Sequence, residues 1–370
     1  MFKKIIKIGA VTVLFLFALF LFIFVIYPRY LSGGIFNVGI GIIDTSTGEM
    51  VFVKSDRFRE VVVLIDESQK KFYTLRKIKE WQRPQQQKDG EVEMRTINTD
   101  GEVIDTKQFP IFLDGYAGKT DYAFSPDSKK FLFYSFEDKS LNLHQFDTKS
   151  NANLISNVSS SGYSIKFIEW ISDKQFIIAL SDDEKSGRLA NEIVLYDIDA
   201  RKKSTLYNPT YLSSSYNHKL SKSGRYLAFG DGAEEYSSYE NIKVLNVQTG
   251  NIVYTVPHSG RTLFFDVDWS PNEDKLVYIM NNTIFTYSLQ DQEEGVIKKF
   301  STDKSVSSVF FLDQNRIVYR VRDRVKDRGK SFLHTISLDK KNENQLIEAA
   351  FNGDLYIVDQ GRYIICELGY

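Results

Sequence analysis

The sequence predicts an all-β protein built from seven four-stranded units, and three observations carry this prediction. A short phrase recurs seven times: an apolar residue, a polar turn, a basic or amide residue, then a strand-like run. Each copy is followed by two more alternating segments joined by Asp-, Asn- or Gly-rich residues, which is typical of a hairpin. The two ends of the 370-residue chain carry complementary halves of one such unit.

The clearest copies of the phrase are "FSPDSKKFLF" from Phe124 and "WSPNEDKLVY" from Trp269. The weaker copies begin at Leu64, Trp170, Leu220, Phe311 and Ile357. With Ile65 as the first anchor, successive anchors lie 59, 46, 50, 49, 42 and 46 residues apart. Four-stranded units that recur about every 40–50 residues are typical of a β-propeller, in which each unit forms one blade.

The chain ends predict how the ring closes. "FNVGIGIIDTSTGEMVFV" (residues 36–53) resembles the third and fourth strands of a blade, and "LYIVDQGRYIICEL" (residues 355–368) resembles the first two. Together they make a seventh blade, whose pairing removes exposed sheet edges. A linear series of hairpins or two β-sandwiches are the alternatives, and neither explains the complementary halves. We therefore expect a seven-bladed β-propeller over residues 36–370, closed by its N- and C-terminal hairpins.

An apolar segment precedes the predicted propeller. The twenty residues from Ile8 to Tyr27 carry no charge, and as a helix about 30 Å long they match a bilayer core. Three lysines precede this segment and Arg29 follows it closely, so the positive-inside rule places residues 1–7 in the cytoplasm and the propeller outside. We predict a single-pass transmembrane helix in the cytoplasmic (inner) membrane, with residues 28–35 as a linker. A cleaved signal peptide is the alternative, but no small-x-small site follows.

The two clearest copies resemble the repeat of TolB-type propellers, whose pattern is roughly W/F-S-P-D-G-K followed by a strand. The same repeat builds the propellers of prolyl-peptidase relatives. The resemblance covers residues 36–370 as architecture, and it implies a cell-envelope role by analogy. The chain departs from the pattern in the copy at Trp170, which lacks the proline, and at Ser128, where glycine is usual. No counterpart of the α/β domain of TolB is expected, because the apolar segment runs directly into strands.

The turn residues of the phrase have structural roles in this interpretation. Pro126 presets φ near about −65°, and Asp127 or Asn272 can hydrogen-bond its own following backbone. The serines that begin these turns can cap the bend, while the aromatic anchors Phe124 and Trp269 would pack between blades. Each turn offers one carboxylate, whereas calcium takes about 6–8 oxygen ligands, so we expect no metal there.

The sequence offers no catalytic motif. There is no G-x-S-x-G, so the hydrolase domain of prolyl-peptidase relatives is not expected. There is no H-x-x-x-H, H-E-x-x-H or glycine-rich phosphate loop, and Cys366 is the single cysteine. The four histidines are expected in different blades: His144, His218, His258 and His334. We therefore name no catalytic, cofactor-binding or metal-ligating residue and no cofactor. The net charge of −1 gives no overall field for nucleic acid.

One charged stretch stands out. In "RIVYRVRDRVKDRGK" (residues 316–330), basic residues at every second position would share one face of an extended strand. These candidate binding residues are Arg320, Arg322, Arg324, Lys326, Arg328 and Lys330. One hypothesis is an arm that binds an anionic polymer, lipid headgroups or an acidic partner. The alternative is a solvated hairpin whose basic side chains pair with Asp323 and Asp327.

Loop lengths predict which face of the propeller binds. If the strands of each blade are named A to D, the A–B and C–D turns share one face, and the B–C and D–A loops share the other. The A–B turns are short and alike, whereas the B–C loops vary, and variable loops on a regular scaffold usually carry binding. The eight-residue linker reaches at most about 28 Å. We therefore expect the variable-loop face to lie near the bilayer.

These features suggest a membrane-anchored extracytoplasmic propeller that acts as a protein-interaction or ligand-binding scaffold in the cell envelope, with an envelope protein as partner. The alternative is an enzyme with a site at the channel mouth, such as a lyase or a glycan- or peptide-processing activity. A cluster of His, Arg and Asp at the inner ends of several blades would favour the enzyme. A sensor is disfavoured, because residues 1–7 are too short to be an output domain.

Overall fold

The computed structural model describes residues 39–54, 60–66, 70–77, 92–109, 122–135, 140–148, 150–156, 163–182, 190–209, 218–232, 239–262, 264–323, 331–349, 351–358 and 360–368. These residues form 28 β-strands. Within these ranges no helix is long and apolar enough to span a membrane. The predicted anchor (residues 8–27) and linker (residues 28–35) lie outside the described residues.

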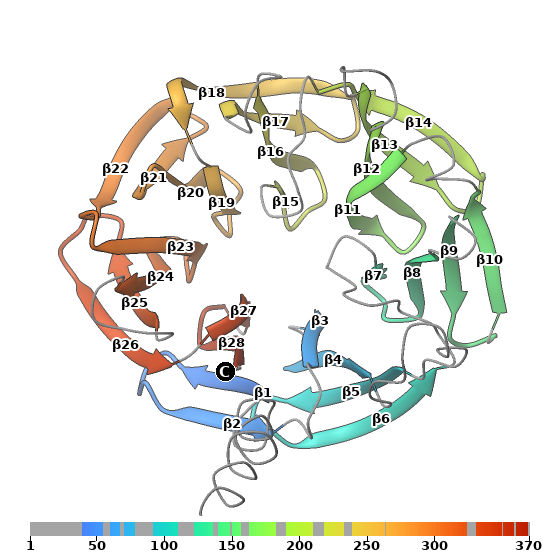
Figure 1. The fold of residues 1–370 in the computed structure, drawn as a ribbon, viewed down its shortest axis with the longest axis horizontal. Helices are drawn as coiled ribbons and strands as arrows, with labels where there is room; N and C mark the ends of the chain where they lie inside the picture. The colour runs from blue at the N-terminus through green and yellow to red at the C-terminus, as the bar shows by residue number, and fades with distance from the viewer. Residues whose placement is uncertain are drawn as a thin grey trace, which may run out of the picture.

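The strands form seven four-stranded antiparallel sheets, which are arranged as blades around a central axis (Figure 1). Blade 1 comprises β3 (Glu60–Asp66), β4 (Lys71–Lys77), β5 (Val92–Asn98) and β6 (Val103–Phe109). Blade 2 comprises β7 (Tyr122–Phe124), β8 (Lys130–Ser135), β9 (Ser140–Gln145) and β10 (Ser150–Ile155). Blade 3 comprises β11 (Tyr163–Ser172), β12 (Gln175–Asp182), β13 (Ala190–Asp197) and β14 (Lys202–Tyr207).

Blade 4 comprises β15 (His218–Leu220), β16 (Tyr226–Gly232), β17 (Tyr239–Asn246) and β18 (Asn251–Thr262). Blade 5 comprises β19 (Phe264–Trp269), β20 (Lys275–Met280), β21 (Thr283–Ser288) and β22 (Glu293–Lys299). Blade 6 comprises β23 (Lys304–Phe311), β24 (Arg316–Asp323), β25 (Ser331–Ser337) and β26 (Glu343–Ala349). Blade 7 comprises β27 (Phe351–Val358), β28 (Tyr363–Leu368), β1 (Gly39–Asp44) and β2 (Met50–Lys54). The first strand of each blade lies innermost (Figure 1).

Blade 7 joins the two ends of the described chain. Its strand order is β2-β1-β28-β27, so β1 lies between its own hairpin partner and the last strand. The register pairs Gly39 with Leu368 and Ile42 with Ile365. Figure 1 shows the blue β1 beside the red β28. The predicted seven-bladed ring and its closure by complementary hairpins are therefore confirmed.

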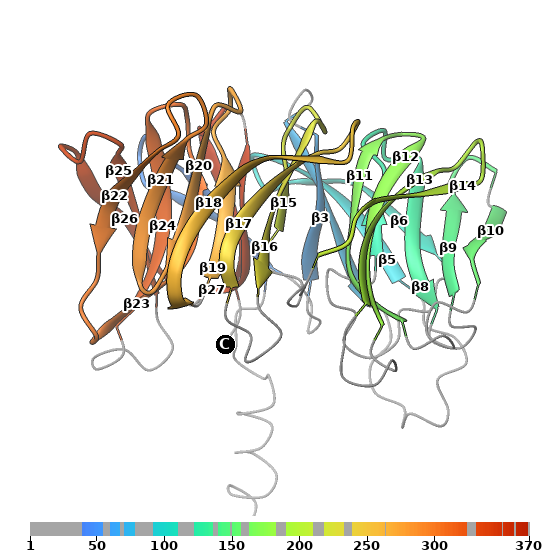
Figure 2. The same ribbon diagram turned by 90° about the horizontal axis from the view of Figure 1, so that it is seen from above.

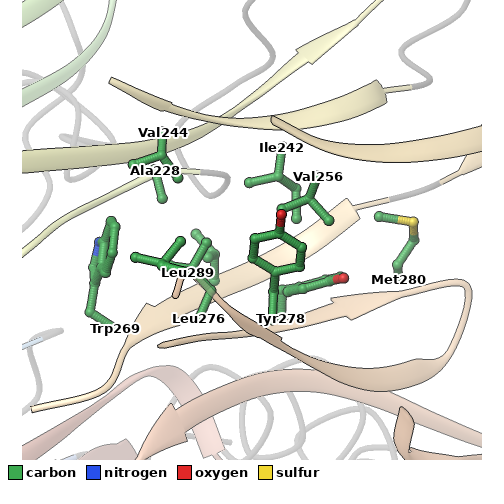
Figure 3. Close-up of a cluster of buried hydrophobic side chains, with 11 residues drawn as sticks. Ala228, Ile242, Val244, Val256, Trp269, Leu276, Tyr278, Met280 and Leu289 are labelled. Carbon is green, nitrogen blue, oxygen red and sulfur yellow. The ribbon is translucent and has the colours of Figure 1, made fainter. Parts of the chain in front are cut away.

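The hydrophobic core lies between the blades. Figure 3 shows one cluster, in which Ala228, Ile242 and Val244 of blade 4 face buried side chains of blade 5. The blade 5 side chains in this cluster are Val267, Trp269, Leu276, Tyr278, Met280, Tyr287 and Leu289. Val277 and Ile279 point the opposite way and pack against blade 6. Because successive side chains of a strand point to opposite faces, the second strand of a blade packs against both neighbouring blades. Its sequence is therefore a continuous apolar run.

The A–B turn of blade 2 has the predicted chemistry. Ser125 Oγ accepts a hydrogen bond from the Lys130 amide at 2.9 Å and donates to Asp127 Oδ1 at 2.5 Å. Asp127 Oδ1 also accepts from the Lys129 amide at 3.0 Å. Phe124 packs between blades 1 and 2, in the same cluster as Leu75. Serine therefore caps this bend, and the aspartate bonds its own following backbone.

The A–B turn of blade 5 differs from the prediction in one residue. Ser270 Oγ accepts from the Lys275 amide at 2.9 Å, as in blade 2, but it donates to Asp274 Oδ1 at 2.7 Å rather than to Asn272. The Asn272 amide instead donates across the blade boundary to Gln314 Oε1 at 3.2 Å. The two turns have the same length, but in blade 5 the carboxylate stands four positions after the serine instead of two, so Asp274 takes the role expected of Asn272.

The A–B and C–D turns lie on the face of the ring opposite to the B–C connections, as a meander requires. The short A–B and C–D turns lie on one face (Figure 2). The B–C connections fall on the other face because the strands of a meander alternate in direction. In blade 5 this connection is the two-residue turn Asn281–Asn282, in which both residues have positive φ (46° and 60°). Most of the longer B–C loops, residues 78–91 and 233–238 among them, lie outside the described residues.

We expect opposite stability changes from two substitutions in A–B turns. Ser128 has φ +58°, a conformation that costs L-residues about 1–2 kcal/mol. Ser128→Gly should therefore raise the free energy of unfolding by up to about 1 kcal/mol. Gly361 has φ +90°, and a Cβ there would lie 2.0 Å from the Leu312 carbonyl oxygen, so Gly361→Ala should destabilise by about 1–3 kcal/mol. Urea unfolding measures both; equal signs would contradict the turn assignment.

Candidate functional site

The innermost strands bring one residue of each blade to an equivalent position near the axis. This inner ring consists of the residues directly before the apolar anchors, each paired with the same position on the second strand of its blade. The described members are Ala123, Glu169, Lys219, Asp268, Phe310 and Tyr356. The three charged members, Glu169, Lys219 and Asp268, fall on three consecutive blades, 3 to 5.

Asp266 and Asp268 connect blade 5 to blade 6. Asp266 Oδ2 accepts a hydrogen bond from the Val309 amide at 3.1 Å, and Asp268 Oδ2 accepts from the Phe311 amide at 2.8 Å. Both donors lie on β23, whose inner edge has no further strand to pair with. The carboxylates thus satisfy backbone amides that the sheet leaves open.

Lys219 reaches Asp268 from the neighbouring blade. Its Nζ lies 3.6 Å from Asp268 Oδ1 and 5.7 Å from the centre of the Phe310 ring, two blades away. Burial raises the pKa of Asp268, and Lys219 together with the backbone amide of Phe311 offsets that rise only in part. The pair therefore brings a half-exposed ammonium next to a carboxylate that is more basic than usual.

His218 forms a polar contact between blades 3 and 4. Its Nε2 lies 3.2 Å from Glu169 Oε1, and its ring stacks on Phe167 with centroids 3.8 Å apart and planes 14° from parallel. Phe167 is buried, so the stacked face of the imidazole is dry, while Glu169 is more exposed. The imidazole is thus fixed in position, with one ring face on Phe167 and its edge toward Glu169.

Taken together, Glu169, His218, Lys219, Asp266 and Asp268 place carboxylates, an ammonium and an imidazole on the inner strands of blades 3 to 5. Each of these groups contacts a group of an adjacent blade, so they join the blades. Within the described part of the chain, no group of three His, Cys, Asp or Glu residues is arranged to hold a metal ion. The arrangement can bind a polar or charged group through Lys219 and Glu169, and its acid–base groups are His218 and Asp268.

The structure separates the histidines, with one correction to the sequence prediction. His218 lies on β15 and His258 on β18, so both belong to blade 4 rather than to different blades. The other two lie on blades 2 and 6, where His144 Nδ1 contacts Asn151 Oδ1 at 2.7 Å and His334 stacks on Tyr319. The spacing of His218 and His258 along the chain, 40 residues, matches the blade period, but it runs from the first strand of a blade to the fourth.

The predicted basic arm is described only at its start. Arg320 and Arg322 lie on β24. Residues 324–330 lie outside the described residues, and they include the other four candidates: Arg324, Lys326, Arg328 and Lys330. Arg320 is half-buried, and its Nε donates to Ser307 Oγ at 2.9 Å. Arg322 is exposed, and Val321 between them is buried. The alternation expected of a strand thus holds from Arg320 to Arg322, while the binding role stays a prediction.

Arg320 also faces blade 7. Burial raises the pKa of the Cys366 thiol to about 12, and Arg320 is one of the groups that oppose this rise. Cys366 is fully buried, and its Sγ lies 3.4 Å from the Gly41 carbonyl oxygen across the closing strand pair. The first of the candidate binding residues, Arg320, is therefore partly used in blade packing, and Arg322 is the first candidate that faces solvent.

Comparison with known proteins shows the fold alone. No protein-family model and no curated protein matches the sequence. An oligogalacturonate lyase in complex with manganese is 10% identical and covers 91% of this chain and 98% of its own, with a TM-score of 0.62. A prolyl endopeptidase is 13% identical over 81% of this chain and 45% of its own, with a TM-score of 0.56. TolB from Acinetobacter baumannii is 16% identical over 75% and 60%, with a TM-score of 0.43. The lyase and the endopeptidase, with TM-scores above 0.5, support the β-propeller fold of this chain.

We expect Asp268→Asn to leave stability unchanged or to raise it at neutral pH. Because the pKa of Asp268 is raised in the folded state, the native protein binds its proton more tightly than the unfolded chain does. Stability from this group is present at low pH and declines as pH rises from about 3.8 through the folded pKa. The asparagine removes that decline. Urea unfolding at several pH values between about 4 and 7 tests this.

Asp127→Asn is the matched control for the Asp268 variant. Hydrogen bonds from Ser125 and the Lys129 amide outweigh the effect of burial and hold the pKa of Asp127 below its usual value. This carboxylate therefore stabilises the fold above about pH 3.8 and loses that effect in acid, and its replacement should cost about 1 kcal/mol at neutral pH. If Asp268→Asn cost as much as Asp127→Asn, the burial argument for Asp268 would be wrong.

Proposed function

We propose that this chain is a membrane-anchored extracytoplasmic β-propeller that binds an envelope partner. In this proposal residues 8–27 span the cytoplasmic membrane and residues 1–7 lie in the cytoplasm. The observation that supports the scaffold role is that charged side chains of the inner strands form hydrogen bonds and ion pairs with neighbouring blades. Asp266 and Asp268 accept backbone hydrogen bonds from β23, and Lys219 and His218 pair with carboxylates of adjacent blades. These groups hold a rigid ring together, which is what a scaffold that presents loops requires.

The surface that we propose for binding continues from Arg322. This arginine is exposed at the end of β24 where the strand approaches the variable-loop face. The five basic residues from Arg322 to Lys330 would extend an anionic-ligand site along that loop. Lipid headgroups, an envelope polymer and an acidic protein share the negative charge that such a site recognises.

A second candidate is an enzyme with its site in the channel. One observation favours it: Glu169, His218, Lys219 and Asp268 gather on the inner strands of blades 3 to 5, as an acid–base site would need. The fold similarity to an oligogalacturonate lyase suggests an acidic oligosaccharide as the first substrate to try. Turnover of oligogalacturonate by the full chain, with and without manganese, that is lost in Lys219→Met would favour the enzyme over the scaffold.

We predict that the propeller is accessible from outside the cell. The native Cys366 is fully buried with a thiol pKa of about 12, so it should not react with a maleimide in the folded protein. Lys222→Cys places a thiol on an exposed A–B turn. In intact cells, a membrane-impermeant maleimide should label Lys222→Cys and leave the parent chain unlabelled. Labelling of the variant only after lysis would contradict the proposed orientation of the propeller outside the cell membrane.

We also predict that Arg322 contributes to binding of anionic surfaces. With the full chain in detergent, Arg322→Gln should weaken binding to vesicles rich in an anionic phospholipid by about fivefold, since each basic residue near such a surface contributes about 1 kcal/mol. The effect should shrink as salt is raised. Lys202→Gln, an exposed charge at the C–D turn side of blade 3, is the control. Equal losses in both variants would exclude a localised site at the basic stretch.

A further inference from the structure

The boundary between blades 5 and 6 contains a cluster of titratable side chains away from the channel. Lys298 of β22 donates from Nζ to Tyr319 OH at 3.1 Å. Both Lys298 and Tyr319 donate to Glu343 Oε1 of β26. The Lys298 ammonium also lies 5.4 Å from the centre of the Phe300 ring. One carboxylate thus ties the outer strand of blade 5 to the second and fourth strands of blade 6.

His334 completes this cluster from β25. Its ring stacks on Tyr319, with centroids 5.3 Å apart and planes 9° from parallel, and its Nδ1 lies 3.7 Å from Glu343 Oε1. Tyr319 is fully buried, and His334 is mostly buried, with 22% of its side chain exposed. The imidazole therefore lies against the carboxylate that holds the two blades together, within reach of solvent protons.

The charged and titratable groups around His334 come from four strands. Lys298 approaches from β22, Lys304 from β23, Tyr319 from β24 and Glu343 from β26. Two of these are cations and one is an anion already bound by Lys298 and Tyr319. A proton on His334 would place a third positive charge here and draw Glu343 away from Lys298.

The internal repeat supplies a natural version of this cluster without the histidine. In blade 5, Tyr278 pairs in register with Phe285, as Tyr319 pairs with His334 in blade 6. Tyr278 stacks on Phe285 with centroids 5.5 Å apart, and it donates to Glu294. A phenylalanine therefore fits the position of the imidazole and preserves the tyrosine–carboxylate contact.

A second cluster of the same composition lies between blades 3 and 4. Lys243 Nζ donates to Tyr207 OH at 2.6 Å and to Asp231, and Tyr207 OH donates to Asp231 Oδ2 at 3.1 Å. Its lysine, tyrosine and carboxylate match those between blades 5 and 6, and the side chains described in it do not include a histidine. The chain thus carries an internal reference for a blade boundary of this chemistry.

We propose that acidification loosens the boundary between blades 5 and 6, and that His334 is the group that senses the proton. When His334 is neutral, its ring stacks on Tyr319, and Glu343 keeps its hydrogen bond from Lys298. Imidazolium competes for the same carboxylate and is repelled by Lys298 and Lys304. The outer strands β22 and β26 then separate locally, which exposes a new face of the propeller rim. This inference does not depend on the proposed scaffold role.

The direction of the pH effect follows from the buried setting. Burial lowers the pKa of His334, Lys298 and Lys304 lower it further, and Glu343 opposes them only in part. The open state therefore binds the proton more tightly than the closed state. The stabilising effect of the closed boundary is complete above about pH 6.5 and is lost as pH falls through the folded pKa.

Amide hydrogen exchange on the full chain tests the proposal. Between about pH 8 and pH 5, where histidine titrates, the protection factors of β22 and β26 should fall relative to those of β14 and β17 at the blade 3–4 boundary. The fall should be about tenfold for each unit by which the pKa of His334 is lowered. His334→Phe should abolish the difference, and His144→Phe, a histidine on blade 2, should leave it unchanged.

Two outcomes would overturn the proposal. One is an equal pH response at the two boundaries in the parent chain; the other is a fall at β22 and β26 that persists in His334→Phe. If His334→Phe does not fold, an NMR titration of the histidine side chains decides, with His334 assigned by substituting the other three. A midpoint below that of a free histidine supports the inference, and a midpoint at or above it excludes the inference.

Discussion

The antiparallel pairing of β1 with β28 is the constraint on which the rest of the structure depends. A blade with a neighbour on each side buries both faces of its second strand, as Val277 and Tyr278 do on opposite sides of β20. Without closure, the two terminal blades would each expose one such face and a free strand edge. The pairing of Ile42 with Ile365 therefore stabilises all seven blade boundaries, because it gives every blade two neighbours.

Apolar packing and polar pairs both stabilise the boundaries between blades, and the two have different roles. Apolar side chains pack in clusters at each of the seven boundaries, as in the cluster of Figure 3. Polar pairs fix the rotation of one blade against the next, since a hydrogen bond such as that from the Phe311 amide to Asp268 is directional. At the axis these pairs use backbone amides of the inner strand. Nearer the rim they use a lysine, a tyrosine and a carboxylate, whose mutual contacts leave none of the three charged or hydroxyl groups buried alone.

The sequence predicted what depends on local chemistry and missed what depends on neighbours in space. The serine-capped turn at Ser125 and the anchor Trp269 are recognisable because their partners lie within about five residues or one blade repeat. The contact of Lys219 with Asp268 joins residues 49 apart, and it depends on how two inner strands face each other. Glu169 and Asp268, which directly precede Trp170 and Trp269, could have indicated the inner ring. The prediction from sequence used only the turn residues that follow these anchors. The prediction that the four histidines lie in different blades was wrong for His218 and His258, which stand on the first and fourth strands of blade 4.

Ring closure also sets the order in which the molecule can become complete. Gly41 and Cys366, which meet in blade 7, are 325 residues apart in the chain. Contacts of such separation are slow to form, since loop-closure entropy must be overcome before they stabilise anything. As the chain emerges from the ribosome, β1 and β2 can form a hairpin long before β28, the last of the described strands, is available to pair with the inner edge of β1. During that interval the edge is open to any extended segment, so the time between synthesis of the first and last hairpins is when this protein is most exposed to mispairing.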